Sequence, residues 1–274
     1  MDAISVELMT IYLPKDLLRY INSFCKYEKI DDINIKNVVQ LWFDDEKKCT
    51  FLYNHISKWN VSNVTKMNSL FEGMLDFNED ISNWNVSNVT NMCFMFYDCV
   101  DFNCNLENWN MSSVKDCSFM FFNCINFNCN LKKWNMNNVE NISCMFINNE
   151  SLCCEQIFQI SDKTTLISGC FYGCKKFNAD VSNWNVSNVT SLEFLFFDCL
   201  EFNCDLKNWN ISNVTSLEGT FFNCVNFDQD IRSWNTVNVR NMIGTFINCY
   251  SFSYDLRCWN RQNLISDDLM FFKK

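Results

Sequence analysis

The 274-residue chain contains only five glycines and one proline, although a chain of this length must reverse direction many times. Glycine and proline are the residues that most often form turns, so another residue type must do so here. Asparagine is the candidate, because 42 asparagines are present and most recur at fixed positions. Its side chain tolerates left-handed backbone angles and can bond the backbone at a corner. We therefore expect asparagine to form the turns.

Long hydrophobic runs and clusters of basic residues are also missing. No apolar run reaches the roughly 18 residues that cross a bilayer. The first 18 residues carry Asp2, Glu7 and Lys15 and have no basic region before an apolar one, so they do not resemble a signal peptide. Lysine and arginine are scattered singly or in pairs rather than massed, and the net charge is -10. We therefore expect a cytoplasmic protein that binds neither nucleic acid nor an anionic membrane.

The motifs of common enzymes are absent from the sequence. Its one histidine, His55, has no nucleophile at a matching spacing, and there is no Gly-rich phosphate loop, G-x-S-x-G or H-E-x-x-H motif. None of the 18 cysteines forms a C-x-x-C pair, whereas zinc fingers use ligand spacings of two to four. The sequence therefore predicts no catalytic residues, no cofactor and no metal site.

What the sequence does contain is a 25-residue repeat, of which residues 77–101, FNEDISNWNVSNVTNMCFMFYDCVD, are typical. Each unit has one tryptophan, except where Gln159 takes its place, and one phenylalanine that recurs in all nine units. The tryptophans are Trp59, Trp84, Trp109, Trp134, Trp184, Trp209, Trp234 and Trp259. The phenylalanines are Phe71, Phe96, Phe121, Phe146, Phe171, Phe196, Phe221, Phe246 and Phe271. A fixed period predicts stacked units that bury their apolar sides against their neighbours.

The expected fold class is an α/β repeat solenoid of about nine coils over residues 49–274, with one short strand and one short helix in each coil. Residues 80–86 are the expected strand, because isoleucine, valine and tryptophan are enriched there. Residues 91–97 are the expected helical turns, because Met92, Met95 and Phe96 follow helical spacing.

Residues 1–48 do not follow the repeat. Leu13 and Pro14 open one helical pattern, and Asp31 and Asp32 precede another. The apolar stripe of the second helix consists of Ile35, Val38, Val39 and Trp42. The general interpretation of this segment is a helical cap, because the end of a repeat stack exposes an apolar face that must be covered.

The cysteines form two columns at the repeat period. One contains Cys99, Cys124, Cys174, Cys199, Cys224 and Cys249, and the other contains Cys104, Cys129, Cys154 and Cys204. Buried core thiols are the favoured interpretation. Disulfides between neighbouring coils are a second possibility, because the rungs lie within the allowed range, and a metal site is a third.

The two residues before each tryptophan vary while the framework around them is constant. This exposed position becomes more basic toward the C-terminus, and it is a candidate binding strip. Its basic members are Lys132, Lys133, Lys207, Arg232 and Arg257. The unit at residues 151–175 has lost its tryptophan and is a second candidate, either a bend or a contact site. Neutral drift and decay are the alternatives.

The recurring unit WNVSNVTNMCFMFYDCVDFNCNL resembles the repeats of BspA-like leucine-rich repeat surface proteins. The resemblance implies a right-handed stack similar to leucine-rich repeats, and a non-enzymatic role in adhesion or protein binding. Copies without export signals resemble those of large DNA viruses and some protists. For such a copy we expect a monomer whose protein partner comes from a host cell.

The N-terminus resembles the F-box pattern of Leu-Pro, a double-leucine helix, a second apolar helix and a closing tryptophan. This resemblance implies a Skp-type adaptor as a partner and a role as substrate receptor of a ubiquitin ligase. The residues that would contact the adaptor are Leu13, Pro14, Leu17, Leu18, Ile21 and Phe24.

Overall fold

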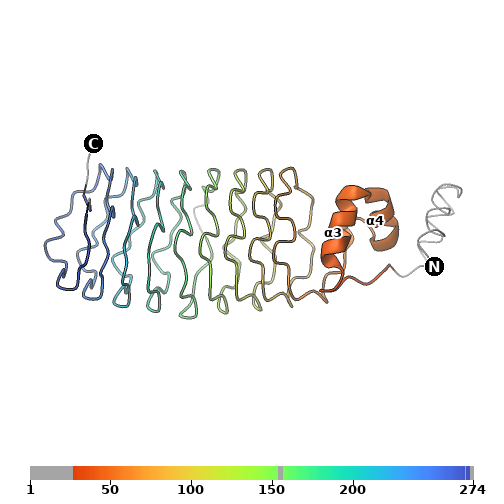
Figure 1. Ribbon diagram of the computed structural model, residues 1–274, viewed down its shortest axis with the longest axis horizontal. Helices are drawn as coiled ribbons and strands as arrows, with labels where there is room; N and C mark the ends of the chain where they lie inside the picture. Colours follow the sequence, from red (N-terminus) through yellow and green to blue (C-terminus); the bar gives the residue numbers. More distant parts are fainter. Residues whose placement is uncertain (1–26, 154–156, 269, 272–274) are drawn as a thin grey trace, which may run out of the picture.

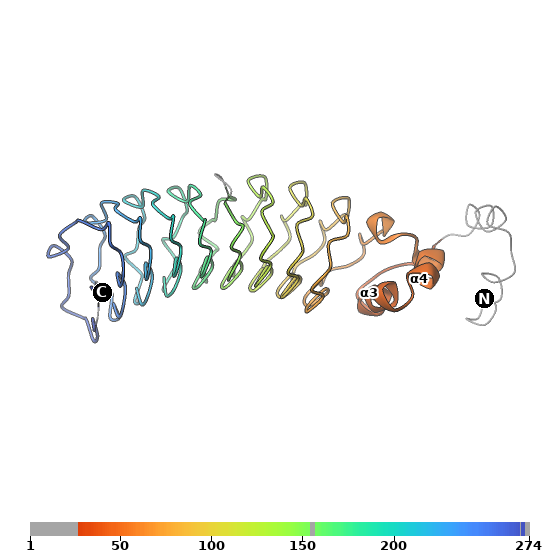
Figure 2. The same cartoon turned by 90° about the horizontal axis from the view of Figure 1, so that it is seen from above.

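The chain forms an elongated stack of 25-residue coils with two helices packed at its N-terminal end (Figures 1 and 2). The computed structural model describes residues 27–153, 157–268 and 270–271. Helix α3 spans Ile35–Asp44, helix α4 spans Glu46–Tyr53, and a short 3-10 turn, η1, spans Ile56–Lys58. The stack of coils follows η1 and continues to the end of the described chain.

Helix α3 confirms the second helix expected near the N-terminus. Ile35, Val38, Val39 and Trp42 are buried, and the ring of Trp42 meets that of Trp59 edge-on with centroids 6.0 Å apart. The helix therefore covers the apolar end of the stack. Helix α4 was not expected, and it crosses the predicted boundary between residues 48 and 49. The first predicted helix, from Leu13 to Phe24, lies outside the described residues.

The predicted fold class, an α/β solenoid with a strand and a helix in each coil, is wrong. In the described part of the chain, the only regular elements are α3, α4 and η1, and all three precede the tandem coils. Parallel pairing between coils is limited to isolated bridges, such as Lys66 with Asn91 and Asn91 with Asp116. The coils are built from successive tight turns instead.

Residues 80–86 do not form a strand because two turns occupy this part of the coil. The Trp84 N–H bonds the Ile81 carbonyl at 3.1 Å, and the Val89 N–H bonds the Val86 carbonyl at 2.9 Å. Each turn brings its first and fourth residues inward, and all four of these side chains are buried. The enrichment in valine and isoleucine therefore reflects burial within turns rather than extended backbone.

Residues 91–97 do not form a helix because alternate N–H groups bond the next coil. The Met95 N–H bonds Met92 within the coil at 3.2 Å, but the Phe96 N–H bonds the Met120 carbonyl of the next coil at 2.9 Å. Phe94 and Asp98 have φ values of 58°, whereas an α-helix needs negative φ throughout. Helical spacing of the apolar residues is thus produced by a repeated turn.

The predicted apolar columns are confirmed as continuous stacks in the core. Phe71 and Phe96 stack with centroids 5.5 Å apart, and Phe96 and Phe121 follow at 5.4 Å. The indole N–H of each repeat tryptophan after Trp59 donates to a backbone carbonyl 26 or 28 residues earlier in the chain, as Trp84 does to Ile56 at 2.9 Å. Core packing and hydrogen bonding therefore both run along the stack.

The expected role of asparagine is confirmed in part. Asn88 donates its side-chain amide to the Ser62 carbonyl of the preceding coil at 2.8 Å, and the equivalent asparagines of later coils repeat this bond. Asn123 and Asn223 are left-handed, with φ of 56° and 59°. All five glycines also have positive φ. The few glycines are thus placed only where the backbone is left-handed.

The coil without a tryptophan keeps its aromatic column through a neighbouring residue. Phe158, one position before Gln159, stacks on Trp134 with centroids 6.4 Å apart and on Trp184 at 5.9 Å. The Trp184 indole N–H donates to the Phe158 carbonyl at 2.9 Å. The coil is one residue short before Phe158 and one residue longer after it, so the register is restored.

Asp32 completes the hydrogen bonding of the first coil. In later coils the N–H at this position bonds a carbonyl of the coil before, as Thr90 does to Thr65 at 2.8 Å. The first coil has no coil before it, and there the Asp32 carboxylate accepts from the N–H groups of Thr65 at 2.7 Å and Lys66 at 3.1 Å. Burial acts to raise the pKa of Asp32, but the hydrogen bonds from Thr65 and Lys66 outweigh it and keep the pKa below its usual value.

Candidate functional site

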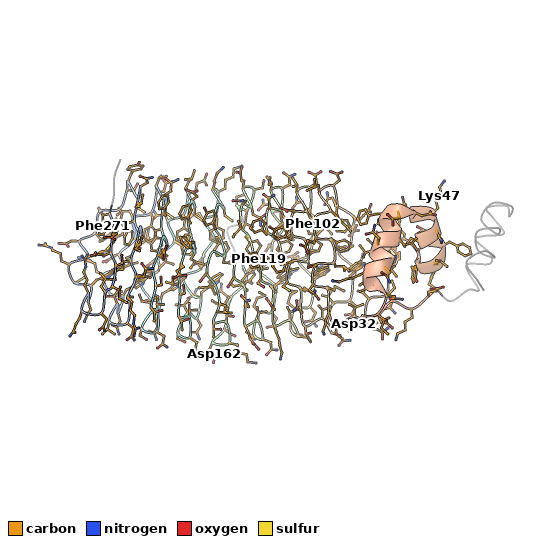
Figure 3. All side chains as sticks on the ribbon, in the orientation of Figure 1. Asp32, Lys47, Phe102, Phe119, Asp162 and Phe271 are labelled. Atoms are coloured by element: carbon orange, nitrogen blue, oxygen red, sulfur yellow. The ribbon has the colours of Figure 1, made fainter. Side chains whose placement is uncertain are left out.

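Aromatic side chains line one outer face of the stack. We call this surface the aromatic strip. It combines a column of one residue from each of seven consecutive coils with three phenylalanines beside it, and all ten side chains are half-buried. The column consists of Tyr97, Phe122, Ile147, Tyr172, Phe197, Phe222 and Ile247, and the three neighbours are Phe94, Phe119 and Phe194. Figure 3 shows Phe119 midway along the height of the stack, away from the edge at which Asp162 lies.

Between adjacent coils, the rings of the strip stack more closely than those of the core column of Phe71, Phe96 and Phe121. Tyr97 and Phe122 have centroids 4.4 Å apart, and Phe197 and Phe222 have centroids 4.3 Å apart. Phe94 and Phe119 stack at 4.7 Å with an interplanar angle of 7°. Each ring therefore has a defined position before any partner binds, which lowers the conformational entropy lost on binding.

Three phenylalanines of the strip have strained backbones. Phe94, Phe119 and Phe194 have φ values of 58°, 57° and 54°, and a left-handed conformation costs a residue with a side chain roughly 1–2 kcal/mol. At the equivalent position, later coils have glycine, including Gly219 with φ of 56°. Glycine satisfies the backbone without strain, and these three rings are not fully buried. Strain that core packing does not require is typical of functional positions.

The Phe194 ring lies against the glycine at this position of the next coil. A Cβ atom added to Gly219 would lie 2.7 Å from Cδ1 of Phe194. The Phe194 ring therefore lies over the backbone of Gly219 and fills the space of its missing side chain. In this part of the strip one aromatic ring covers two coils.

Carboxylates border the strip. Asp98 accepts a hydrogen bond from Nδ2 of Asn123 at 2.9 Å. Burial raises the pKa of the Tyr97 phenol, and the nearby charges of Asp98 and Glu72 raise it further. Burial likewise raises the pKa of Tyr172, with a further contribution from Asp198. The strip is thus an apolar surface with negative charge along its side.

The predicted basic positions are exposed, but most of their charge is neutralised. Lys133 pairs with Glu107 at 3.3 Å. In three consecutive C-terminal coils the basic residue pairs with the aspartate two positions before it. These pairs are Lys207 with Asp205 at 2.9 Å, Arg232 with Asp230 at 2.7 Å, and Arg257 with Asp255 at 2.5 Å.

We call these three pairs the ion-pair row. Its aspartates also accept hydrogen bonds from backbone N–H groups, so they stabilise the turn as well as balancing the basic charge. A shallow hollow between the coils is lined by Lys207, Asn208, Asp230, Arg232, Ser233 and Cys258. Lys132 is exposed, and its N–H bonds Asn130 at 2.9 Å. The row is polar and locally neutral rather than basic.

The other predicted contact residues, Leu13, Pro14, Leu17, Leu18, Ile21 and Phe24, lie outside the described residues. Two residues of the F-box-like pattern that are described, Val38 and Trp42, are buried against the first coil. Their position in the structure is that of a cap for the stack.

The first cysteine column lies in the core and makes a repeated hydrogen bond. The Cys99 thiol donates to the Phe71 carbonyl at 3.0 Å, and the Cys124 thiol donates to the Phe96 carbonyl at 2.9 Å. Burial raises the pKa of Cys99 to about 12. In the second column burial raises the pKa of Cys104 and of Cys204 to about 11. Such thiols are poor nucleophiles and poor metal ligands.

Two properties of the described residues bear on metal ions and membranes. Their His, Cys, Asp and Glu side chains form no group of three or more that could hold a metal ion. None of their helices has the length and apolar character of a membrane span.

Sequence reasoning missed the aromatic strip. The signal was present, because an aromatic or aliphatic residue follows each core phenylalanine from Tyr97 to Ile247. That signal could not be separated from core packing while the segment was expected to be helical, since the apolar side of a helix would include these residues.

Comparison with protein families bears on the whole repeat region. Residues 26–157 and 165–274 match the family described as "Mycoplasma protein of unknown function, DUF285". The chain belongs to this family. The residues between the two DUF285 matches fall in the coil where Phe158 replaces tryptophan. No curated protein and no solved structure matches the chain. Membership of DUF285 agrees with the repeat architecture and assigns no activity.

Proposed function

We propose that the chain is a BspA-like repeat protein that binds a protein partner through the aromatic strip and catalyses no reaction. The observation that carries the proposal is the strained backbone of Phe94, Phe119 and Phe194. These residues keep aromatic rings on the surface where other coils have glycine, serine or cysteine. Aromatic residues held rigidly at a surface are the usual anchors of protein interfaces.

The ion-pair row is expected to contribute less to binding than the aromatic strip does. A partner that covered Arg232 and Asp230 would have to remove water from both charges, and this cost often cancels the attraction gained. Covering the aromatic strip removes apolar surface from water instead, which contributes roughly 25 cal/mol per Å². The strip is therefore expected to supply most of the binding energy, with the row at the rim of the contact.

A comparison of matched variants tests this proposal. Wild type, a strip variant (Tyr97→Ser, Phe122→Ser, Phe197→Ser) and a cap variant (Ile33→Ser) are each immobilised and exposed to a cell extract. Ile33 is a suitable control because its side chain is 90% exposed on the cap and apart from the strip. The retained proteins are identified and their affinities are measured after purification. We expect binding to wild type and to the cap variant, and its loss in the strip variant.

The proposal would be contradicted if wild type, the strip variant and the cap variant all retained the same proteins equally. Circular dichroism and thermal unfolding of the strip variant verify that it is folded. A row variant (Lys207→Ser, Arg232→Ser, Arg257→Ser) shows how much the ion-pair row contributes. A larger loss in the row variant than in the strip variant would assign the binding face to the row.

A further inference from the structure

We propose that the segment which binds the aromatic strip is a cationic amphipathic α-helix, held at two equivalent clusters four coils apart. This inference rests on the proposed function and specifies its partner. Three independent features carry it: an internal duplication of the strip, the use of backbone hydrogen-bonding groups within the stack at the first cluster, and the charge beside the rings.

The strip contains the same cluster twice, 100 residues apart. In the first, Phe94 lies 5.6 Å from Tyr97, and Asp98 accepts from Asn123 at 2.9 Å. In the second, Phe194 lies 6.0 Å from Phe197, and Asp198 accepts from Asn223 at 2.6 Å. Phe94 and Phe194 are both left-handed, as are Asp98 and Asp198. The two clusters thus have equivalent parts, with Phe197 in place of Tyr97 and with interplanar angles of 41° in the first and 64° in the second.

The distance between the clusters sets the length of the partner. Neighbouring coils joined by parallel ladder bonds are about 4.8 Å apart, so four coils correspond to roughly 19 Å. An α-helix rises 1.5 Å per residue, so about 13 residues separate its two anchors. A helix of roughly 20 residues would therefore reach both clusters, with Ile147 and Tyr172 between them.

In the coil of the first cluster, the backbone of this face offers a partner no free groups between residues 92 and 97. The N–H groups of residues 92 and 94–98 all bond carbonyls of the same or the next coil, and the Cys93 N–H bonds the Asn91 side chain. The carbonyls of residues 91–97 all accept N–H groups. A strand cannot pair with such a surface. A bound segment must satisfy its own backbone, as an α-helix does.

The charges beside the strip favour a cationic helix, although Lys175, which pairs with Glu150 at 2.6 Å, also lies near Asp198. Asp98 and Asp198 belong to the clusters, and Glu193 and Glu218 each precede the first left-handed position of their coils. Glu218 accepts a hydrogen bond from Asn241 Nδ2 at 2.7 Å, so its carboxylate lies beside this face. The chain as a whole has a net charge of -10. Lysine or arginine at the edges of an apolar helix face would match these positions.

Synthetic peptides test the inference directly. The probe is a 21-residue peptide with leucine on one helical face and lysine on the other. One control has the same composition with leucine and lysine alternating, and a second control replaces lysine with glutamate. Binding to the full chain is measured by fluorescence anisotropy, and peptide helicity by circular dichroism. We expect the probe to bind about 10-fold or more tightly than either control, with a gain of helicity.

Variants of the two clusters test their equivalence. Phe94→Ser and Phe194→Ser are expected to fold, because Ser69 occupies this position in the first coil with φ of 56°. Each substitution should lower the affinity for the probe by about 10-fold, and the double variant should lower it by about 100-fold. A truncated probe of 10 residues should bind wild type weakly. Neither single variant should lower the affinity for this short probe by more than about 3-fold. Ile33→Ser should bind as wild type does.

Equal binding of the alternating peptide, or equal affinity in Phe194→Ser and Ile33→Ser, would overturn the inference. So would binding of the chain to phosphatidylcholine vesicles in preference to the probe. The proposed function fails separately. If a natural partner needs the strip but binds in an extended form, the inference of a helical partner is wrong and the proposed function still holds. If no natural partner depends on the strip, both are wrong.

Discussion

The side-chain amide of Asn149 donates to the backbone carbonyl of Phe121 at 3.0 Å, a bond that cysteine makes in six other coils. The substitution preserves the donor, but it adds an oxygen, and Oδ1 of Asn149 is buried without a hydrogen-bond partner. The core of the stack thus contains one position where the residue is less suitable than its equivalents.

Replacing Asn149 with cysteine is therefore expected to stabilise the protein. Removal of the unsatisfied oxygen should raise the free energy of unfolding by about 1–3 kcal/mol. Urea unfolding followed by tryptophan fluorescence measures the change. The inverse substitution, Cys124→Asn, brings the same amide into a neighbouring coil and should destabilise by a similar amount. A lower stability in Asn149→Cys would show that the oxygen has a partner.

Loss of the Asp32 carboxylate should weaken the N-terminal end of the stack. Asp32→Ala leaves the N–H groups of Thr65 and Lys66 without their acceptor, at a cost of about 1–2 kcal/mol at pH 7. The exposed Asp76 supplies a control, Asp76→Ala, in which little change is expected. Differential unfolding in urea gives both values.

The contribution of Asp32 should also depend on pH. The pKa of Asp32 is lower in the folded chain than its usual value. The stabilisation is therefore complete above the unfolded pKa, about 3.9, and is lost as the pH falls through the folded pKa. The difference between wild type and Asp32→Ala should shrink at pH 2. An undiminished difference at that pH would mean that the carboxylate charge is irrelevant.

Gly219→Ala tests the position of the Phe194 ring. Its added Cβ would meet Cδ1 of Phe194 at 2.7 Å, whereas a Cβ at Gly73, with φ of 75°, meets nothing within 4 Å. Both substitutions strain a left-handed backbone by roughly 1 kcal/mol. Gly219→Ala should therefore be the more destabilising, by about 1 kcal/mol or more. The double variant Gly219→Ala, Phe194→Ser should recover this excess. Equal losses of stability at Gly73 and Gly219 would show that the Phe194 ring does not lie against Gly219.

Thiol reactivity should follow burial. Cys258 is exposed, whereas burial raises the pKa of Cys99 to about 12. At pH 8 the thiolate fraction of Cys99 is on the order of 10⁻⁴, against about a quarter for an unperturbed thiol. Brief alkylation followed by peptide mass spectrometry should therefore modify Cys258 and leave Cys99 intact until the chain unfolds. Early modification of Cys99 would contradict its place in the core.

The sequence predicted the period, the columns and the buried cysteines of the first column, because these depend only on which residues recur. In the second column Cys204 is half-buried, and Cys154 lies outside the described residues. Trp84 and Phe96 are buried in the structure as expected. The sequence did not predict the backbone conformation, because a tight turn and a helix both bring residues three apart onto one side. The left-handed angles of Phe94 and Asp98 decide between them, and no propensity of phenylalanine suggests such an angle.

The candidate site was misplaced for a related reason. Variation before the tryptophans drew attention to Lys207 and Arg232, but their charge is balanced by aspartates that also hold the turn. The aromatic strip was hidden because its residues look like core residues in the sequence. The replacement of tryptophan was likewise assigned to Gln159, although Phe158 fills the column after a one-residue shift in register.

The most direct test of the central claim places a photo-reactive benzophenone amino acid on each face. It replaces Phe197 in one protein and Lys207 in another, and each protein is irradiated with the partner bound. The aromatic strip as binding face predicts a strong cross-link from position 197 and a weak one from position 207. A partner cross-linked from position 207 alone would contradict it.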